Sequence, residues 1–255
     1  MHKIGIKAGF PNVTPDFLET VKPYIDFLEW SMTQSMNWEN IDTAGIPIKV
    51  VHISYWNSPP KINLADAGVN DRNIRELKES IRIADYHKSE SIVIHPERTI
   101  NENCSLDNVV YLLNKVKDTR FAIENMSARF EFFEEEFLGQ NAEELKYVID
   151  RTNIRSCFDI GHASCYAYAE GLDFKKYYQS FFDLKPLVYH FSDDRFFIND
   201  KGICPDQHLH LGKGDIDWEL VLSMMPEDSI ITLETSPDGG HEDDVKLIRR
   251  LEKKK

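Results

Sequence analysis

Cysteines are few in this 255-residue sequence, and long apolar runs are missing. The four cysteines form no CxxC pair and no disulfide-like framework, so we expect reduced thiols, as in a reducing compartment. No apolar run approaches the roughly 20 residues that cross a membrane. The N-terminal segment enters a strand pattern at once, without the apolar core of a signal peptide. We therefore expect a cytoplasmic protein with no membrane partner.

Positive charge is also scarce. The sequence has 30 Lys and Arg residues and 43 Asp and Glu residues, which gives a formal net charge of −13. A balance this acidic argues against a broad basic footprint for nucleic acid. Divalent cations bound in a cleft would, however, change the local field. DNA therefore stays open as a partner but is not favoured by charge.

Short apolar segments alternate with helical patterns along the whole chain. The expected strands are residues 3–7, 27–30, 48–53, 91–95, 121–125, 156–160, 187–191 and 229–235. The expected helices are residues 15–22, 71–88, 106–116, 141–152, 174–182, 217–225 and 244–254, with caps at Thr14, Asn70, Ser105, Asn141 and Asp217. Eight strands alternating with helices predict an α/β fold, a single-domain (β/α)8 TIM barrel over residues 1–255.

Metal-capable side chains recur where the predicted strands end. The run from Cys157 to His162 places Asp159 inside an apolar segment, with His162 three residues further on. Asp and His are costly to bury unpaired, so this pair needs water, a partner or a metal. Strands three to eight all end in this way, at His52, His95, Glu124, Asp159, His190 and Glu234.

A single strand-end His or Glu is more often a rim residue than a ligand, but the repetition over six strands is a stronger signal. The active sites of TIM barrels lie at these strand ends. Asp206 and His208 add a further pair on a loop. Carboxylate with imidazole is the ligand mix expected for zinc or manganese. The alternative is a polar pocket without metal.

The segments that carry these residues match the motifs of a known family. They read His52-Ile53-Ser54-Tyr55, Ile94-His95-Pro96, Ile123-Glu124-Asn125, Cys157-Phe158-Asp159-Ile160-Gly161-His162-Ala163, His190-Phe191-Ser192-Asp193, Asp206-Gln207-His208 with Leu211-Gly212-Lys213-Gly214, and Leu233-Glu234-Thr235. Over almost the whole chain the sequence resembles the xylose isomerase-like TIM-barrel superfamily (AP endonuclease family 2). Within it, the endonuclease IV branch, which cuts DNA at abasic sites, is the most similar.

The resemblance implies a zinc cluster with nine ligands, all of which have counterparts here. The first zinc would be held by His52, His95 and Glu124, the second by Glu124, Asp159, His190 and Glu234, and the third by His162, Asp206 and His208. Two or three divalent ions, zinc or manganese, are therefore the expected cofactors. Tyr55 matches an aromatic residue that contacts DNA in that family, and is a candidate substrate-binding residue.

Two chemistries fit these residues. The first is hydrolysis of a phosphoester, including that of abasic sites in DNA, with Glu124 bridging the metals and placing the attacking water. The second is isomerisation or epimerisation of a sugar or sugar phosphate around one metal. There Glu124 and Glu234 would act as the acid/base pair, and His162 and Arg195 would bind substrate oxygens.

The outer ligands favour the hydrolase, because an isomerase has no need of His52, His95, Asp206 and His208 together. Two departures from the family pattern concern the substrate. The Asp-Arg-His triplet of the family carries Gln207 in place of its arginine, which removes a cation that would meet a phosphate. Residues 31–40 contain no Arg or Lys. Both departures argue against DNA as the substrate, and the two chemistries stay open.

Two further segments have two interpretations each, and three further histidines are expected to have no role in the site. The Gly212-Lys213-Gly214 segment is either a phosphate cradle or a tight turn. The acidic, Phe-rich run 131–136 is either a substrate lid or an amphipathic helical turn. His2, His87 and His241 lie on a terminus, a helix and a loop, so we expect them to be solvated.

Overall fold

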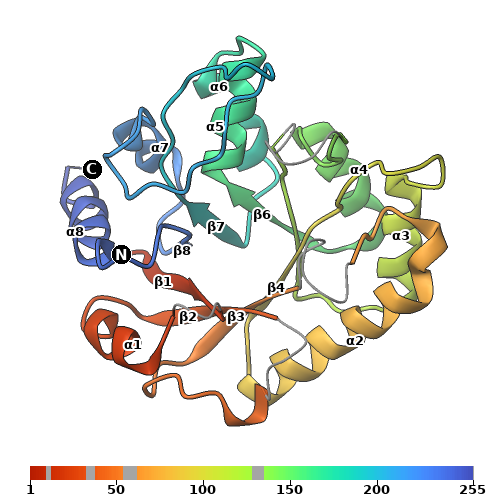
Figure 1. Cartoon of the computed structure of the whole chain (residues 1–255), viewed down its shortest axis with the longest axis horizontal. Coiled ribbons are helices and arrows are strands. Elements are labelled where there is room, and N and C mark those ends of the chain that lie inside the picture. Colours follow the sequence, from red (N-terminus) through yellow and green to blue (C-terminus); the bar gives the residue numbers. More distant parts are fainter. Residues whose placement is uncertain (10–12, 33–37, 54–61, 128–134, 255) are drawn as a thin grey trace.

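Eight parallel strands close into a barrel with the helices around its outside (Figure 1). The computed structural model describes all residues except 10–12, 33–37, 54–61, 128–134 and 255. Each strand pairs with the next in sequence, and the last pairs with the first. The strands are β1 (Lys3–Ala8), β2 (Phe27–Ser31), β3 (Ile48–His52), β4 (Ser91–Ile94), β5 (Phe121–Glu124), β6 (Arg155–Asp159), β7 (Val188–Phe191) and β8 (Ile230–Leu233). The predicted TIM barrel is confirmed.

The described part of the chain contains eight α helices and two short 3₁₀ turns. None of these helices is long and apolar enough to cross a membrane. The helices are α1 (Pro15–Val21), α2 (Asn70–His87), α3 (Leu106–Lys115), α4 (Ala142–Thr152), α5 (Ile160–Ala169), α6 (Phe174–Phe182), α7 (Trp218–Met224) and α8 (His241–Glu252), and the 3₁₀ turns are η1 (Trp38–Asn40) and η2 (Ala67–Val69).

Alternation along the strands separates the barrel interior from the helix-facing side. In β6, Phe158 faces the helices, and its ring stacks on Phe181 of α6 at 4.8 Å between centroids. Cys157 lies on the other side, in the apolar floor of the barrel, as a small core residue. Gly5 is required there, because a Cβ atom would lie 2.4 Å from the Phe27 ring. The floor consists of Phe27, Val50, Val93, Ala122, Cys157 and Val188.

Most of the predicted helix caps are confirmed, and one is wrong. Asn70 is the first residue of α2 rather than its cap. The preceding turn η2 begins at a cap formed by Asp66, and the Asn70 side chain instead exchanges hydrogen bonds with that of Asn108. The confirmed caps, each accepting a bond from a first-turn N–H, are Thr14, Ser105, Asn141 and Asp217.

Helix α5 was not predicted from the sequence. It follows β6 without a loop, and the Asp159 carboxylate caps it by accepting a hydrogen bond of 2.6 Å from the His162 N–H. Seven of its residues are buried, so it lacks the one-sided apolar stripe by which a surface helix is found. At the other end of the chain, α8 begins at His241, three residues before the predicted start.

Candidate metal centre

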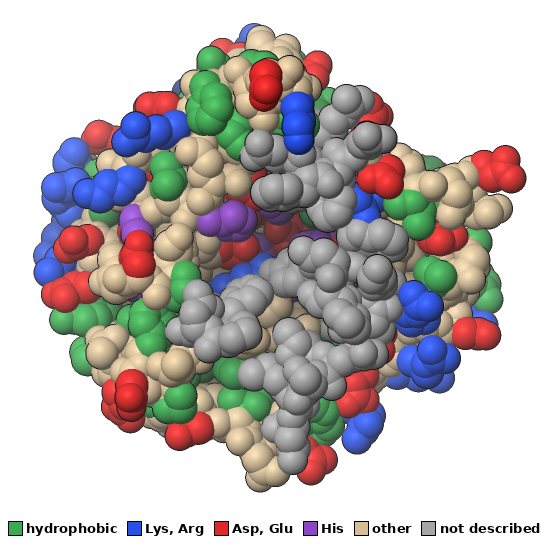
Figure 2. Space-filling model, viewed as in Figure 1, with side chains coloured by type: hydrophobic (Ala, Val, Ile, Leu, Met, Phe, Trp, Pro, Cys, Tyr) green, Lys and Arg blue, Asp and Glu red, His purple; other side chains and the backbone are tan. Residues whose placement is uncertain are grey.

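The predicted strand-end residues meet at the C-terminal mouth of the barrel. In the space-filling view, His and acidic side chains lie in a hollow at the centre of this face (Figure 2). Two groups of buried residues coincide with the first two predicted sets, and within each group the ligand atoms all lie within 4.8 Å of one another. They are His52, His95 and Glu124 (the outer set), and Glu124, Asp159, His190 and Glu234 (the central set).

Glu124 faces both sets at once. Its Oε2 atom lies 3.3 Å from His52 Nε2 and 3.0 Å from His95 Nε2. Its Oε1 atom lies 3.3 Å from His190 Nδ1 and 3.5 Å from His162 Nδ1. The two oxygens of one carboxylate therefore point to two different groups of imidazoles.

The third predicted set converges on a single carboxylate. His162 Nε2 lies 3.3 Å and His208 Nε2 lies 3.1 Å from Asp206 Oδ2. Among the described residues, these three do not form a group whose ligand atoms all lie within 4.8 Å of one another. The three residues therefore lie near one another, but their ligand atoms are less closely grouped than those of the other two sets.

Three of the histidines are oriented by backbone carbonyls. A carbonyl oxygen only accepts, so the ring nitrogen against it must carry the proton, and the other nitrogen faces the carboxylates. This arrangement is typical of metal-ligating histidines, whose second nitrogen is held by an outer acceptor. The contacts are His52 Nδ1 to Ile53 O at 2.8 Å, His162 Nδ1 to Asn125 O at 2.9 Å, and His208 Nδ1 to Glu234 O at 2.8 Å.

Two histidines are oriented by carboxylates instead. His95 Nδ1 lies 3.4 Å from Glu97 Oε1, which leaves its Nε2 for Glu124. His190 is turned the other way: Nε2 lies 3.0 Å from Glu29 Oε2, and Nδ1 faces the central set. Each of the five histidines thus has one nitrogen engaged and the other directed at a carboxylate.

Several buried polar atoms at the mouth lack a hydrogen bond within the described residues. They include Asp159 Oδ2, His190 Nδ1 and both carboxylate oxygens of Asp206. His190 Nδ1 lies 2.7 Å from Glu234 Oε1, but without the geometry of a hydrogen bond. Leaving such atoms unsatisfied costs about 1–3 kcal/mol each. A bound cation would satisfy them, so the donor set fits divalent metal ions.

Burial and neighbouring charges shift the pKa values in opposite directions. Burial alone would raise the pKa of Glu124, but the His190 and His95 charges hold it well below its usual range. Burial and nearby carboxylates raise the pKa of Asp159 to about 6. Burial opposes protonation of His95, but Glu124 raises its pKa to about 9. Burial and the Lys7 charge lower the pKa of His52 to about 4. The surroundings of His95 therefore favour positive charge, whereas those of His52 disfavour it.

Lys7 and Glu29 also reach the mouth, and sequence reasoning missed both. Glu29 is fully buried. The Lys7 ammonium donates a hydrogen bond to Glu234 and lies 3.9 Å from Glu29 Oε1. Both residues carried the signal used for the other strands, because Lys7 ends the first predicted strand and Glu29 interrupts the second. All eight strands therefore contribute polar side chains to this end of the barrel.

The structure locates one of the two predicted substrate-binding residues. Arg195 is exposed, and its Nε donates a hydrogen bond of 3.3 Å to the Lys213 carbonyl. Its role toward a substrate stays a prediction. Tyr55 lies outside the described residues, as do residues 131–134 of the acidic run.

The expectation that three histidines are solvated is wrong for two of them. His2 is buried, and its Nδ1 accepts a hydrogen bond of 3.2 Å from the Ser229 N–H. His241 is buried as well and packs edge-on against Phe17. His87 is half-buried, with Nε2 at 3.2 Å from the Trp38 carbonyl.

The Gly212-Lys213-Gly214 segment wraps around an internal carboxylate. The Gly212 N–H donates a hydrogen bond of 2.7 Å to Asp193 Oδ2, which also accepts from Trp218 Nε1. A Cβ atom at Gly214 would lie 2.3 Å from Asp193 Oδ1, so the approach requires glycine. The tight-turn interpretation fits this geometry, since Asp193 occupies the place that a phosphate would take.

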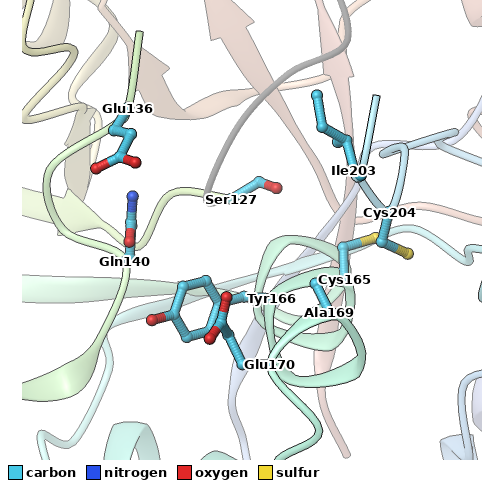
Figure 3. A pocket seen from close by; sticks show the side chains of 10 residues that line it. Ser127, Glu136, Gln140, Cys165, Tyr166, Ala169, Glu170, Ile203 and Cys204 are labelled. Carbon is cyan, nitrogen blue, oxygen red and sulfur yellow. The ribbon is translucent and has the colours of Figure 1, made fainter. Parts of the chain in front are cut away.

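A cavity of about 320 Å³ lies beside the centre (Figure 3). Its lining includes Ser127 after β5, Tyr166 of α5, Glu170 directly after that helix, and Cys204 before Asp206. None of the candidate metal ligands lines this cavity. The candidate metal ligands therefore lie at the barrel mouth and outside the lining of this cavity.

The barrel and the ligand groups at its mouth define the class of this protein. The chain belongs to the xylose isomerase-like TIM barrel family, whose sequence model matches residues 7–251, so the family expected from the motifs is confirmed. A relative named "Probable endonuclease 4" from Campylobacter concisus is 25% identical over an alignment of 199 residues, and the match covers 71% of this chain and 66% of that protein.

Solved structures share the fold at low sequence identity. Endonuclease IV from Thermus thermophilus superposes with a TM-score of 0.70 at 20% identity, covering 99% of this chain and 100% of the other. A 3-keto-D-glucoside 4-epimerase from E. coli superposes with a TM-score of 0.68 at 13% identity, covering 98% and 100%. Both neighbours are enzymes, but their reactions differ.

Proposed function

We propose that this protein is a divalent-metal-dependent hydrolase of phosphoesters. The observation that carries the proposal is the position of Glu124, whose two oxygens face two groups of imidazoles. A carboxylate shared in this way suits a site that holds neighbouring cations, as in two-metal phosphoesterases. A one-metal isomerase has no use for the outer set.

The residues divide among the cations as the resemblance implies. His52 and His95 with Glu124 would hold one, and Asp159, His190 and Glu234 with Glu124 would hold a second. Zinc or manganese fits this mixture of imidazole and carboxylate. When bound, the cations would neutralise phosphate oxygens and make water a nucleophile at neutral pH. A third cation would be held by His162, Asp206 and His208.

The protein residues prepare this site before any cation arrives. Glu124 links the outer and central sets, which is its catalytic role in the proposal. Asp159 uses Oδ1 to cap α5 and keeps Oδ2 for the centre. Asn125 fixes the neighbouring strand ends, because its side chain accepts from the Asp159 N–H at 2.8 Å and donates to the Asp159 carbonyl at 2.9 Å. Side chains held in this way lose little conformational freedom when a cation binds.

A sugar or sugar-phosphate isomerase or epimerase is the second candidate. It is favoured by the acidic net charge of −13 and by the lack of Arg and Lys in residues 31–40. Gln207, which replaces the arginine of the family triplet, donates to the Arg195 and Pro205 carbonyls at 3.0 and 3.3 Å. This side chain is therefore engaged within the loop. In this candidate function Glu124 and Glu234 form the acid/base pair.

Metal content and a side-by-side assay test the two candidates. We expect two or three divalent ions in each chain, and turnover of abasic-site DNA or of small phosphodiesters. A panel of ketoses and ketose phosphates is assayed in parallel. Ketose turnover without phosphoesterase activity would replace the hydrolase with the isomerase. A protein that takes up no metal after incubation with zinc or manganese would refute both.

A further inference from the structure

Glu29 lies behind the candidate metal centre, on β2, and is 0% exposed. Its Oε2 atom accepts hydrogen bonds from His190 Nε2 at 3.0 Å and from the Thr232 hydroxyl at 2.8 Å. Its Oε1 atom makes no hydrogen bond within the described residues and lies 3.9 Å from the Lys7 ammonium. The carboxylate is thus fixed through one oxygen, and the other faces a buried cation.

This contact determines which nitrogen of His190 reaches the centre. With Nε2–H donated to Glu29, Nδ1 is the nitrogen directed at the central set, 3.3 Å from Glu124 Oε1, and its lone pair is available to a cation once this nitrogen has lost its proton. His190 is 0% exposed, so bulk water cannot take the place of the carboxylate. Without an acceptor behind it, the ring would be free to turn or to carry its proton on Nδ1, which would abolish the ligand.

A direct role for Glu29 as a metal ligand is less consistent with the surroundings. One oxygen of Glu29 does lie within 4.8 Å of ligand atoms of His52 and Glu234. The Lys7 ammonium, however, donates to Glu234 and lies close to Glu29. A cation therefore already stands between these carboxylates, and a metal there would be repelled by it.

We propose that Glu29 is a positioning residue, which holds the His190 ring so that Nδ1 faces the metal, with Lys7 as its buried counter-charge. The inference rests on the proposed metal-dependent function. Outer-shell partners of metal-ligating histidines typically contribute 10–100-fold to metal affinity. Glu29 touches no substrate in this assignment and acts through His190 alone.

The test replaces the two buried charges together, because removing one would leave the other uncompensated. The first double variant is Lys7→Met with Glu29→Gln, in which a carbonyl oxygen still accepts from His190. The second is Lys7→Met with Glu29→Leu, in which no acceptor remains. Both carry the same change at Lys7, and only the Gln variant offers His190 an acceptor, so the Gln variant is the matched control. Urea unfolding of the metal-free proteins tests whether both variants fold.

Affinity for Co²⁺ and Zn²⁺ is measured by competition with a chromophoric chelator, and the visible spectrum of bound Co²⁺ reports its ligand geometry. We expect the Leu double variant to bind about 10–100-fold more weakly than the Gln double variant, with a changed Co²⁺ spectrum. Equal affinity and identical spectra in the two would overturn the role of Glu29.

The two proposals fail in different ways. A wild-type protein that binds neither ion refutes the proposed function, whereas equal binding by the double variants refutes only the positioning role. If the Leu double variant does not fold, Glu29→Asp takes its place, because it keeps the charge but shortens the reach by one carbon. That variant should also bind at least about tenfold more weakly than wild type, and wild-type affinity in it would overturn the inference.

Discussion

Replacing His95 by alanine separates the two candidate chemistries. His95 Nε2 lies 3.0 Å from Glu124 Oε2, and the residue is 5% exposed, so water has little access to replace it. The substitution leaves two ligands in the outer set, and we expect one metal equivalent to be lost. If that cation stabilises the transition state by about 3 kcal/mol, kcat/KM for a phosphoester falls roughly 150-fold.

His241→Ala is the matched control, because His241 is also a buried histidine but packs against Phe17 and His210 and belongs to none of the ligand sets. It should lower the melting temperature without changing metal content. Metal content is measured by elemental analysis and turnover with small phosphodiesters and ketoses. Phosphoesterase activity of His95→Ala within a few-fold of wild type, at unchanged metal content, would refute the assignment of His95. Ketose turnover that survives the substitution would favour the isomerase.

Three further predictions follow from the site and the core. Glu124→Gln should abolish turnover on any identified substrate while circular dichroism shows an unchanged fold, and near wild-type turnover would contradict its central position. Removal of metal by a chelator should lower the melting temperature, and adding zinc should restore it. A ligand at 100 times its Kd stabilises the folded state by about 2.7 kcal/mol, and an unchanged melting temperature would argue against a metal site. Phe158→Ala should lower the free energy of unfolding by about 3–5 kcal/mol in urea titrations, since the ring is 0% exposed and stacks on Phe181; a loss below about 1 kcal/mol would contradict that packing.

The strand–helix rhythm was sufficient to predict the barrel, because each strand carries its own apolar run and each surface helix its own stripe. Helix α5 escaped this reasoning for a physical reason. Residues 160–169 are buried on most sides, so their sequence shows no one-sided apolar stripe that would indicate a surface helix. The spacing of Asp159 and His162 indicates a pair of metal ligands as readily as a helix cap. One carboxylate performs both tasks, which sequence spacing alone does not reveal.

The candidate site could be predicted as far as the strand-end rule was applied. The rule predicts polar side chains at the ends of strands three to eight, and the ligand atoms within the outer set and within the central set lie within 4.8 Å of one another. Lys7 and Glu29 were missed, although both interrupt apolar strands. The orientation of each imidazole lay beyond the sequence, because it depends on acceptors distant along the chain, such as Glu29, which is 161 residues from His190.

The closure of the barrel between β1 and β8 has a consequence for how this protein becomes functional. Lys7 of the first strand meets Glu234, which directly follows the last, across a sequence separation of 227 residues. The complete ligand environment therefore cannot exist in a nascent chain that still lacks its C-terminal segment. During synthesis, metal capture by the whole centre has to wait until the last strand has left the ribosome and docked. A cation bound there would then hold together two segments that the chain itself connects only through the entire barrel.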